Sequence, residues 1–124
     1  GDKVLSAIAH CCQAQIRQQD ILARVGGEEF ALFLPGCALP DAQEIAEQCR
    51  QSLEQLDIEY DDQIIQITAS FGVATSRNAD FDSLLKQADD ALYQAKTGGR
   101  NRIVVYQPAD SSSQGNNGQG NNVS

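Results

Sequence analysis

Residues 21–35, ILARVGGEEFALFLP, contain two apolar segments separated by two glycines and two glutamates. The first segment alternates in side-chain type, and residues 30–34 are continuously apolar, as is typical of strands. Glycine adopts positive φ readily, so Gly26 and Gly27 favour a tight turn between the two segments. The run therefore predicts a β-hairpin that carries Glu28 and Glu29 at its bend.

Three segments around this hairpin have the periodicity of amphipathic helices, with apolar residues every three or four positions. They are residues 3–18, 42–56 and 84–95. Asp2 is placed to cap the first helix, and Pro40 suits the first turn of the second. Gly98 and Gly99 form a stop signal after the third. One helix is thus expected before the hairpin and two after it.

Two more segments have strand character. Residues 65–73 alternate between apolar and polar side chains, and Gly72 within them indicates a bulge or a close backbone approach. Residues 102–106 form a short apolar strand at the end of the domain. The order α-β-β-α-β-α-β predicts an α+β fold in which helices flank a mostly antiparallel sheet.

The charge balance and the end of the chain limit the possible functions. The formal net charge of the 124 residues is −8, which argues against non-specific nucleic-acid binding but allows a local basic pocket. Residues 107–124 are rich in Gly, Asn and Ser and predict a disordered tail after a domain at residues 1–106. No apolar run or leader is long enough for membrane contact, so a cytoplasmic location is expected, even if the parent protein is membrane-anchored.

The cysteines give no sign of a zinc site. Cys11, Cys12, Cys37 and Cys49 lack the CxxC spacing, and His10 is the single histidine. Cys12 and Cys49 fall on apolar helix faces, so we expect them to be small buried thiols.

Two segments have the chemistry of a nucleoside-triphosphate site. The carboxylates of the 26–29 turn suit a hard divalent cation, although acidic turns are commonly just solvated. Residues 96–102, KTGGRNR, gather three cations that suit phosphate, although cations also complement a helix C-terminus. A metal-binding turn and a phosphate-binding loop are the two halves of one site.

The pentapeptide GGEEF at residues 26–30 resembles the signature of the GGDEF family of diguanylate cyclases, in its Glu variant. Further blocks agree in order and spacing across residues 1–106: GDKVL, RVGGEEFALFLP, AEQCR, TASFGVA, ADDALYQAK and GRNR. The resemblance implies a nucleotidyl-cyclase, ferredoxin-like fold. It also implies a homodimer that condenses two GTP molecules into cyclic di-GMP, the bacterial second messenger, with release of pyrophosphate.

The same resemblance assigns roles to the turn. Glu28 matches the residue that binds the catalytic metal, Mg²⁺ or Mn²⁺, and is the proposed base for the attacking 3′-hydroxyl. Glu29 is a lesser candidate for contact with metal or substrate. Gly26 and Gly27 would let the nucleotide lie against the turn.

Four other residues match the family's substrate-binding positions. Lys96 and Arg100 match the residues that clamp the β- and γ-phosphates. Asp2 matches the carboxylate that reads the guanine edge, and Leu5 matches part of the guanine pocket.

A product-inhibition site is implied as well. The family carries an RxxD motif five residues before the pentapeptide, and Arg17 and Asp20 stand at that distance here. Arg50 matches a further arginine of the same site. On its own, RxxD would more simply be a charge pair at a helix end.

One departure from the family pattern is expected to matter. The family's first block is a core strand ending in a metal-binding Asp, then a helix with a guanine-binding Asn, and it would lie upstream of Gly1. The abrupt start predicts a piece of a longer protein with an upstream sensor or receiver domain. Without that block we expect little cyclase activity and unpaired edges beside the missing central strand, open to exchange between chains.

Two other functions stay open from the sequence. The domain could bind GTP or cyclic di-GMP as a regulatory module without turning it over. It could also be an interaction domain of ferredoxin-like shape that has no ligand.

Overall fold

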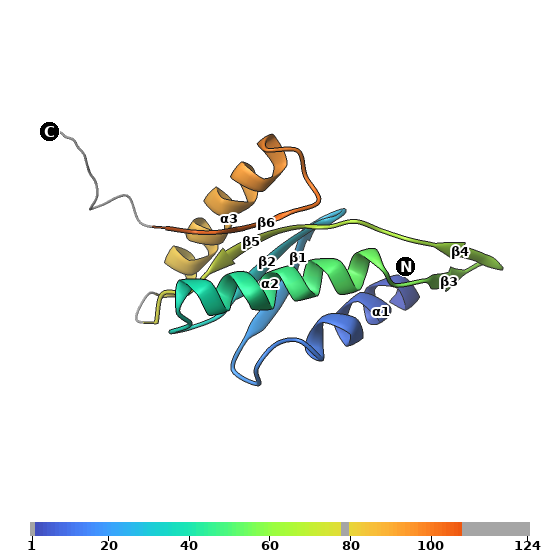
Figure 1. Cartoon of the computed structure of the whole chain (residues 1–124), viewed down its shortest axis with the longest axis horizontal. Coiled ribbons are helices and arrows are strands. Elements are labelled where there is room, and N and C mark those ends of the chain that lie inside the picture. The colour runs from blue at the N-terminus through green and yellow to red at the C-terminus, as the bar shows by residue number, and fades with distance from the viewer. Residues whose placement is uncertain (1, 78–79, 108–124) are drawn as a thin grey trace, which may run out of the picture.

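The computed structural model describes residues 2–77 and 80–107. Apart from Gln107, the predicted tail therefore lies outside the described residues. These ranges contain three helices and six strands, whose arrangement Figure 1 shows. The helices are α1 (Asp2–Gln13), α2 (Leu39–Glu54) and α3 (Phe81–Thr97). The strands are β1 (Ile21–Gly26), β2 (Glu29–Phe33), β3 (Ile58–Tyr60), β4 (Gln63–Ile65), β5 (Ser70–Ala74) and β6 (Ile103–Val105).

The main sheet has four strands in the order β1-β2-β5-β6. The predicted α+β class with flanking helices is confirmed, but the expected mostly antiparallel sheet is wrong for the described strands. Within this four-stranded sheet only β1 and β2 pair antiparallel, whereas β2–β5 and β5–β6 are parallel. A helix lies on each of these two connections, α2 between β2 and β5 and α3 between β5 and β6. Because a helical crossover brings the chain back to the same end of the sheet, the two strands that it joins run parallel.

The facing edges of β2 and β5 pair directly with one another, from Glu29 opposite Ser70 to Phe33 opposite Ala74. No unpaired edge therefore lies between these two strands of the described sheet. The direct pairing satisfies the backbone N–H and C=O groups that would otherwise be left open.

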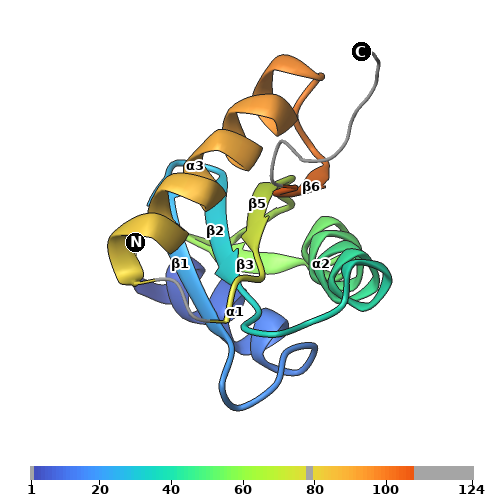
Figure 2. The same cartoon turned by 90° about the vertical axis from the view of Figure 1, so that its left-hand side faces the viewer.

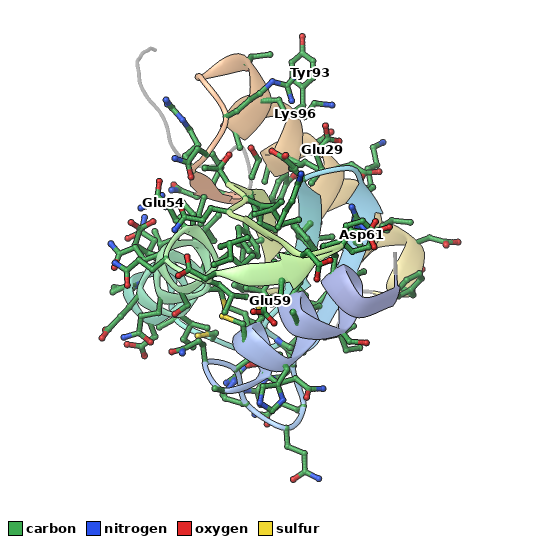
Figure 3. The ribbon with its side chains drawn as sticks, turned by 90° about the vertical axis from the view of Figure 1, so that its right-hand side faces the viewer. Glu29, Glu54, Glu59, Asp61, Tyr93 and Lys96 are labelled. Atoms are coloured by element: carbon green, nitrogen blue, oxygen red, sulfur yellow. The ribbon has the colours of Figure 1, made fainter. Side chains whose placement is uncertain are left out.

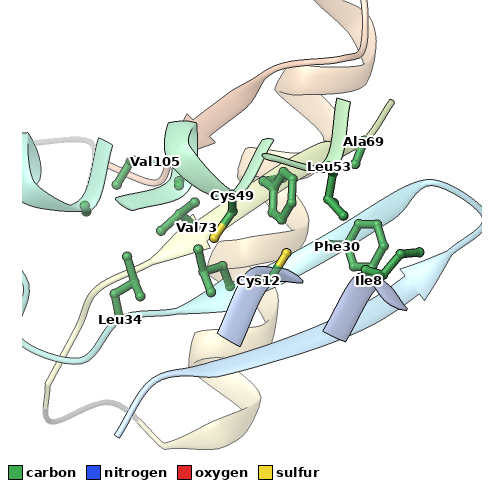
Figure 4. Close-up of a cluster of buried hydrophobic side chains, with 13 residues drawn as sticks. Ile8, Cys12, Phe30, Leu34, Cys49, Leu53, Ala69, Val73 and Val105 are labelled. Atoms are coloured by element: carbon green, nitrogen blue, oxygen red, sulfur yellow. The ribbon is translucent and has the colours of Figure 1, made fainter. Parts of the chain in front are cut away.

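The helices form a layer on each face of this sheet. Figure 2 shows α3 on one face and α1 and α2 on the other. The larger core fills the space between the sheet and the α1–α2 layer (Figure 4), and its two stacked rings, Phe30 and Phe71, have centroids 5.4 Å apart. Ile8 of α1 and Leu53 of α2 belong to the same buried cluster. Each such side chain contributes roughly 1.5–3 kcal/mol relative to exposure.

Helix α3 lies very close to the sheet at Gly72. A Cβ at this position would collide with the Ala88 carbonyl oxygen and would lie 2.6 Å from the Leu92 nitrogen. The predicted close approach is confirmed, because only a residue without a side chain lets the helix backbone come so near β5.

The predicted long strand at residues 65–73 is interrupted. Residues 58–65 instead form the antiparallel β3–β4 hairpin, and the main-sheet strand begins only at Ser70. Figure 1 shows this hairpin at one end of the molecule, beyond the C-terminal end of α2. Its turn residues Asp61 and Asp62 have φ of 50° and 64°, a conformation that Asp tolerates better than most residues.

The prediction that Cys12 and Cys49 are small buried thiols is confirmed. Cys12 of α1 and Cys49 of α2 are fully buried in the larger core, and all four cysteines are free. A hydrogen bond with Cys49, together with burial, raises the pKa of Cys12. None of the helices in the described ranges combines the length and the apolar character needed to cross a bilayer.

Candidate functional site

The acidic turn joins β1 to β2. Gly26 pairs with Glu29, and a register shift between Arg24 and Gly26 marks a bulge just before the bend. The Arg24 guanidinium donates to the Gly27 carbonyl oxygen at 2.7 and 2.9 Å, which closes the turn from one side. The predicted tight turn is present, but it does not use the positive φ that Gly26 and Gly27 permit, because the described glycines with positive φ are Gly36 and Gly99.

The cationic loop follows α3 and meets the acidic turn at Glu29. The Lys96 Nζ lies 3.4 Å from Oε1 of Glu29, and an Arg100 guanidinium nitrogen lies 3.5 Å from Oε2. Figure 3 shows Lys96 and Glu29 together on one side of the molecule. The two halves predicted from sequence therefore converge, and they do so through Glu29.

These ion pairs are weak enough to be exchanged for a ligand. The Arg100 side chain is 65% exposed, and pairs of this kind contribute about 0.2–1 kcal/mol. A triphosphate offers more negative charge and better hydrogen-bond acceptors than one carboxylate. Glu29 thus holds Lys96 and Arg100 beside the acidic turn, where both cations stay partly exposed.

Glu28 presents a different arrangement. Its side chain is exposed, while its backbone carbonyl oxygen accepts a hydrogen bond of 2.9 Å from the Ser70 N–H. Within residues 2–77 and 80–107, no three His, Cys, Asp or Glu side chains gather closely enough to hold a metal ion. A free carboxylate at the turn fits a hard cation that takes its other oxygen ligands from phosphates and water.

Two predicted substrate residues cannot be placed. The side chains of Asp2 and Leu5 lie outside the described residues, although their backbones belong to α1. Their assignment to the guanine edge and pocket stays a prediction.

Arg17 and Asp20 form a closed pair in the turn between α1 and β1. The Arg17 guanidinium donates to both carboxylate oxygens of Asp20 at 2.7–3.0 Å and to the Pro35 carbonyl oxygen at 3.1 Å. The Asp20 side chain is fully buried, and its hydrogen bond raises the pKa of Arg17. The pair lines a shallow surface pocket with Gln13 and Ile16.

Arg50 does not line this pocket. Its guanidinium, on α2, donates to Glu47 at 2.6 and 2.8 Å and to Glu54 at 3.3 Å. A further hydrogen bond of 3.0 Å reaches Oδ1 of Asn101 in the cationic loop. These hydrogen bonds lower the pKa of Glu47 and raise that of Arg50.

Sequence reasoning missed Ser70 and Asn101, which join the acidic turn to the cationic loop through their hydrogen bonds. The Asn101 N–H donates to Oγ of Ser70 at 3.1 Å, and Ser70 is buried. A polar residue that starts an apolar strand, and an Asn after two glycines, were the signals available.

Comparison with known proteins adds independent evidence. The family described as "Diguanylate cyclase, GGDEF domain" matches residues 1–102. Diguanylate cyclase A of Treponema denticola is 40% identical over 108 residues, which cover 85% of this chain and 29% of that protein. The chain therefore spans less than a third of this relative's length.

Solved structures share the same fold. The GGDEF domain of TpbB (YfiN) from Pseudomonas aeruginosa has a TM-score of 0.67 at 31% identity, covering 86% of this chain and 63% of that one. The GGDEF domain of DgcB from Caulobacter crescentus, solved with cyclic di-GMP, has a TM-score of 0.66 at 27% identity. This match covers 85% of this chain and 64% of the other.

Proposed function

The chain belongs to the GGDEF family of diguanylate cyclase domains, and from this premise we propose that its parent protein makes cyclic di-GMP from two GTP molecules. One observation carries the proposal: Glu29 of the GGEEF turn is paired with both Lys96 and Arg100. A carboxylate turn and two cations from a distant helix end thus surround one place, as a metal-bridged triphosphate needs.

In the reaction, the 3′-oxygen of one GTP attacks the α-phosphorus of another GTP, and pyrophosphate leaves. Two such steps, with one GTP on each domain of a homodimer, close the ring. Lys96 and Arg100 bind the leaving β- and γ-phosphates, and Gly26 and Gly27 let the nucleotide approach the turn. Glu28 would hold Mg²⁺ or Mn²⁺, and the bound cation would neutralise phosphate charge and lower the pKa of the attacking hydroxyl.

The 124-residue chain alone is expected to turn over little GTP. Its acidic turn supplies Glu28 and Glu29. The resemblance calls for a further metal-binding Asp, which is not among the 124 residues. Turnover depends on accurate positioning of both nucleotides, so an incomplete metal site should cost most of the rate.

The test compares the full-length parent protein with the 124-residue chain. We expect Mg²⁺-dependent formation of cyclic di-GMP and pyrophosphate from GTP by the full-length protein, and little by the chain alone. Robust turnover by the chain would contradict the second expectation. Tight GTP binding to the full-length protein without any product would favour a non-catalytic regulatory module instead.

We further propose that the Arg17–Asp20 pocket binds cyclic di-GMP and inhibits the enzyme. The proposal is supported by a guanidinium and a carboxylate held together at one surface pocket. Arg17→Lys keeps a charge beside the buried Asp20 but loses the planar fork, so we expect cyclic di-GMP to bind about 10-fold more weakly.

Calorimetry with cyclic di-GMP measures this effect, and Lys86→Ala, which removes an exposed cation from α3, is the matched control. We expect the control to bind like the wild type. Unchanged affinity and unchanged product inhibition in Arg17→Lys would contradict a product site at this pocket.

A further inference from the structure

Ser70 connects the two halves of the nucleotide site. Its N–H donates to the Glu28 carbonyl oxygen at 2.9 Å, and its Oγ accepts from the Asn101 N–H at 3.1 Å. Ser70 is only 3% exposed and lies opposite Glu29 in the β2–β5 ladder. One buried residue therefore spans the distance between the acidic turn and the cationic loop.

The cationic loop has a backbone that needs such support. Arg100 and Asn101 have φ of 63° and 45°, two successive residues in the left-handed region that non-glycine residues adopt uncommonly. Backbone conformations of this kind persist where surrounding contacts hold them in place. The conformation of these two residues decides where the Arg100 guanidinium points.

The Asn101 side chain provides a second attachment, to α2. Its Oδ1 accepts from Arg50 at 3.0 Å, and its Nδ2 donates to Glu54 at 2.9 Å. Arg50 is itself fixed by Glu47, and its side chain is only 14% exposed. Figure 3 shows Glu54 on α2, away from the Glu29–Lys96 pair, so this attachment reaches the loop from outside the site.

We propose that Ser70 and Asn101, with Arg50 and Glu54 behind them, are positioning residues that set the place of Arg100 relative to the acidic turn. None of the four is assigned a direct phosphate contact; they act on the nucleotide through Arg100. Arg50 thereby gains a role in the substrate site of its own chain. This inference rests on the proposed function, because it assumes that Arg100 binds the phosphates of GTP.

The experiment uses the full-length protein with Mg²⁺ and guanosine 5′-(α,β-methylene)triphosphate, which binds but cannot react. Ser70→Ala removes the Oγ acceptor and keeps the N–H that bonds to Glu28. Asn101→Gly accepts the left-handed backbone but loses both side-chain bonds. We expect each change to weaken nucleotide binding about tenfold by calorimetry. Ser76→Ala, in which a hydroxyl bonded to Gln87 is lost, is the matched control and should bind normally.

A double-mutant cycle with Arg100→Ala separates positioning from general destabilisation. If Ser70 and Asn101 act through Arg100, their replacement should have almost no further effect on nucleotide binding once Arg100 is gone. Tenfold losses that persist in the Arg100→Ala background would overturn the proposal.

Hydrogen exchange without nucleotide provides an independent readout. The Asn101 amide should exchange about tenfold faster in Ser70→Ala than in the wild type, because its acceptor is lost. Unchanged exchange would overturn the attachment of Asn101 to Ser70.

The binding results distinguish failure of the proposed function from failure of this inference. If the wild-type protein fails to bind the analogue, both the proposed function and the inference that rests on it are contradicted. Normal binding by the wild type and by both variants overturns the inference alone.

Discussion

Replacing Glu28 by glutamine should lower cyclic di-GMP formation by the full-length protein at least about 100-fold, without affecting the fold. The Glu28 side chain is exposed, so the change removes no buried contact. Its backbone carbonyl, which accepts from Ser70, is retained. A neutral amide is a poor ligand for a hard divalent cation, and therefore the metal should bind weakly at the turn.

Two further variants make the Glu28 result specific. Glu59→Gln makes the same chemical change on the β3–β4 hairpin, outside the proposed site, and should leave turnover unchanged. Glu29→Gln should mainly alter GTP affinity, because it releases Lys96 and Arg100 from their ion pairs. Wild-type turnover in Glu28→Gln, measured as pyrophosphate release across a range of Mg²⁺ concentrations, would refute the metal-binding role.

Replacing Gly72 by alanine should lower the free energy of unfolding by about 3 kcal/mol. The new Cβ would meet the Ala88 carbonyl oxygen and the Leu92 nitrogen, and Leu92 Cβ would be 2.9 Å away. These are mostly backbone atoms, which cannot move aside as the end of a flexible side chain can. Helix α3 must therefore shift away from β5, which opens the packing on that face of the sheet.

Chemical denaturation measures this loss, and Gly27→Ala is its matched control. A Cβ on Gly27 would have no atom within 4 Å, and its φ is not positive, so stability should change by less than about 0.5 kcal/mol. Equal stabilities for the two variants would show that the contact between α3 and β5 is looser than these distances indicate.

The sequence alone predicted the elements whose residues interact locally. The three-and-four periodicity located α1, α2 and α3, and the GGEEF run located the β1–β2 hairpin. These elements could be predicted because helix and hairpin hydrogen bonds join residues close in the chain. For such residues the apolar pattern and the turn residues are enough to indicate the structure. It missed the β3–β4 hairpin, whose sequence IEYDDQII carries several charges and little apolar alternation.

The candidate site divides in the same way. Glu28, Lys96 and Arg100 could be named as candidates from GGEEF and KTGGRNR, since carboxylates suit metal ions and Lys and Arg suit phosphate. That Glu29 is the carboxylate that pairs with both cations could not be predicted. The hydrogen bond from Arg50 to Asn101 could not be predicted either, because these two residues are 51 positions apart.

Sequence by itself thus determined the family, the helices and the residue types of the site. Only the tertiary structure decided the direction in which β5 pairs with β2, the close approach of α3 at Gly72 and the bridging place of Ser70. The physical reason is that these features are contacts between residues far apart in the chain. Their geometry follows from how whole layers pack, which no local pattern of side chains specifies.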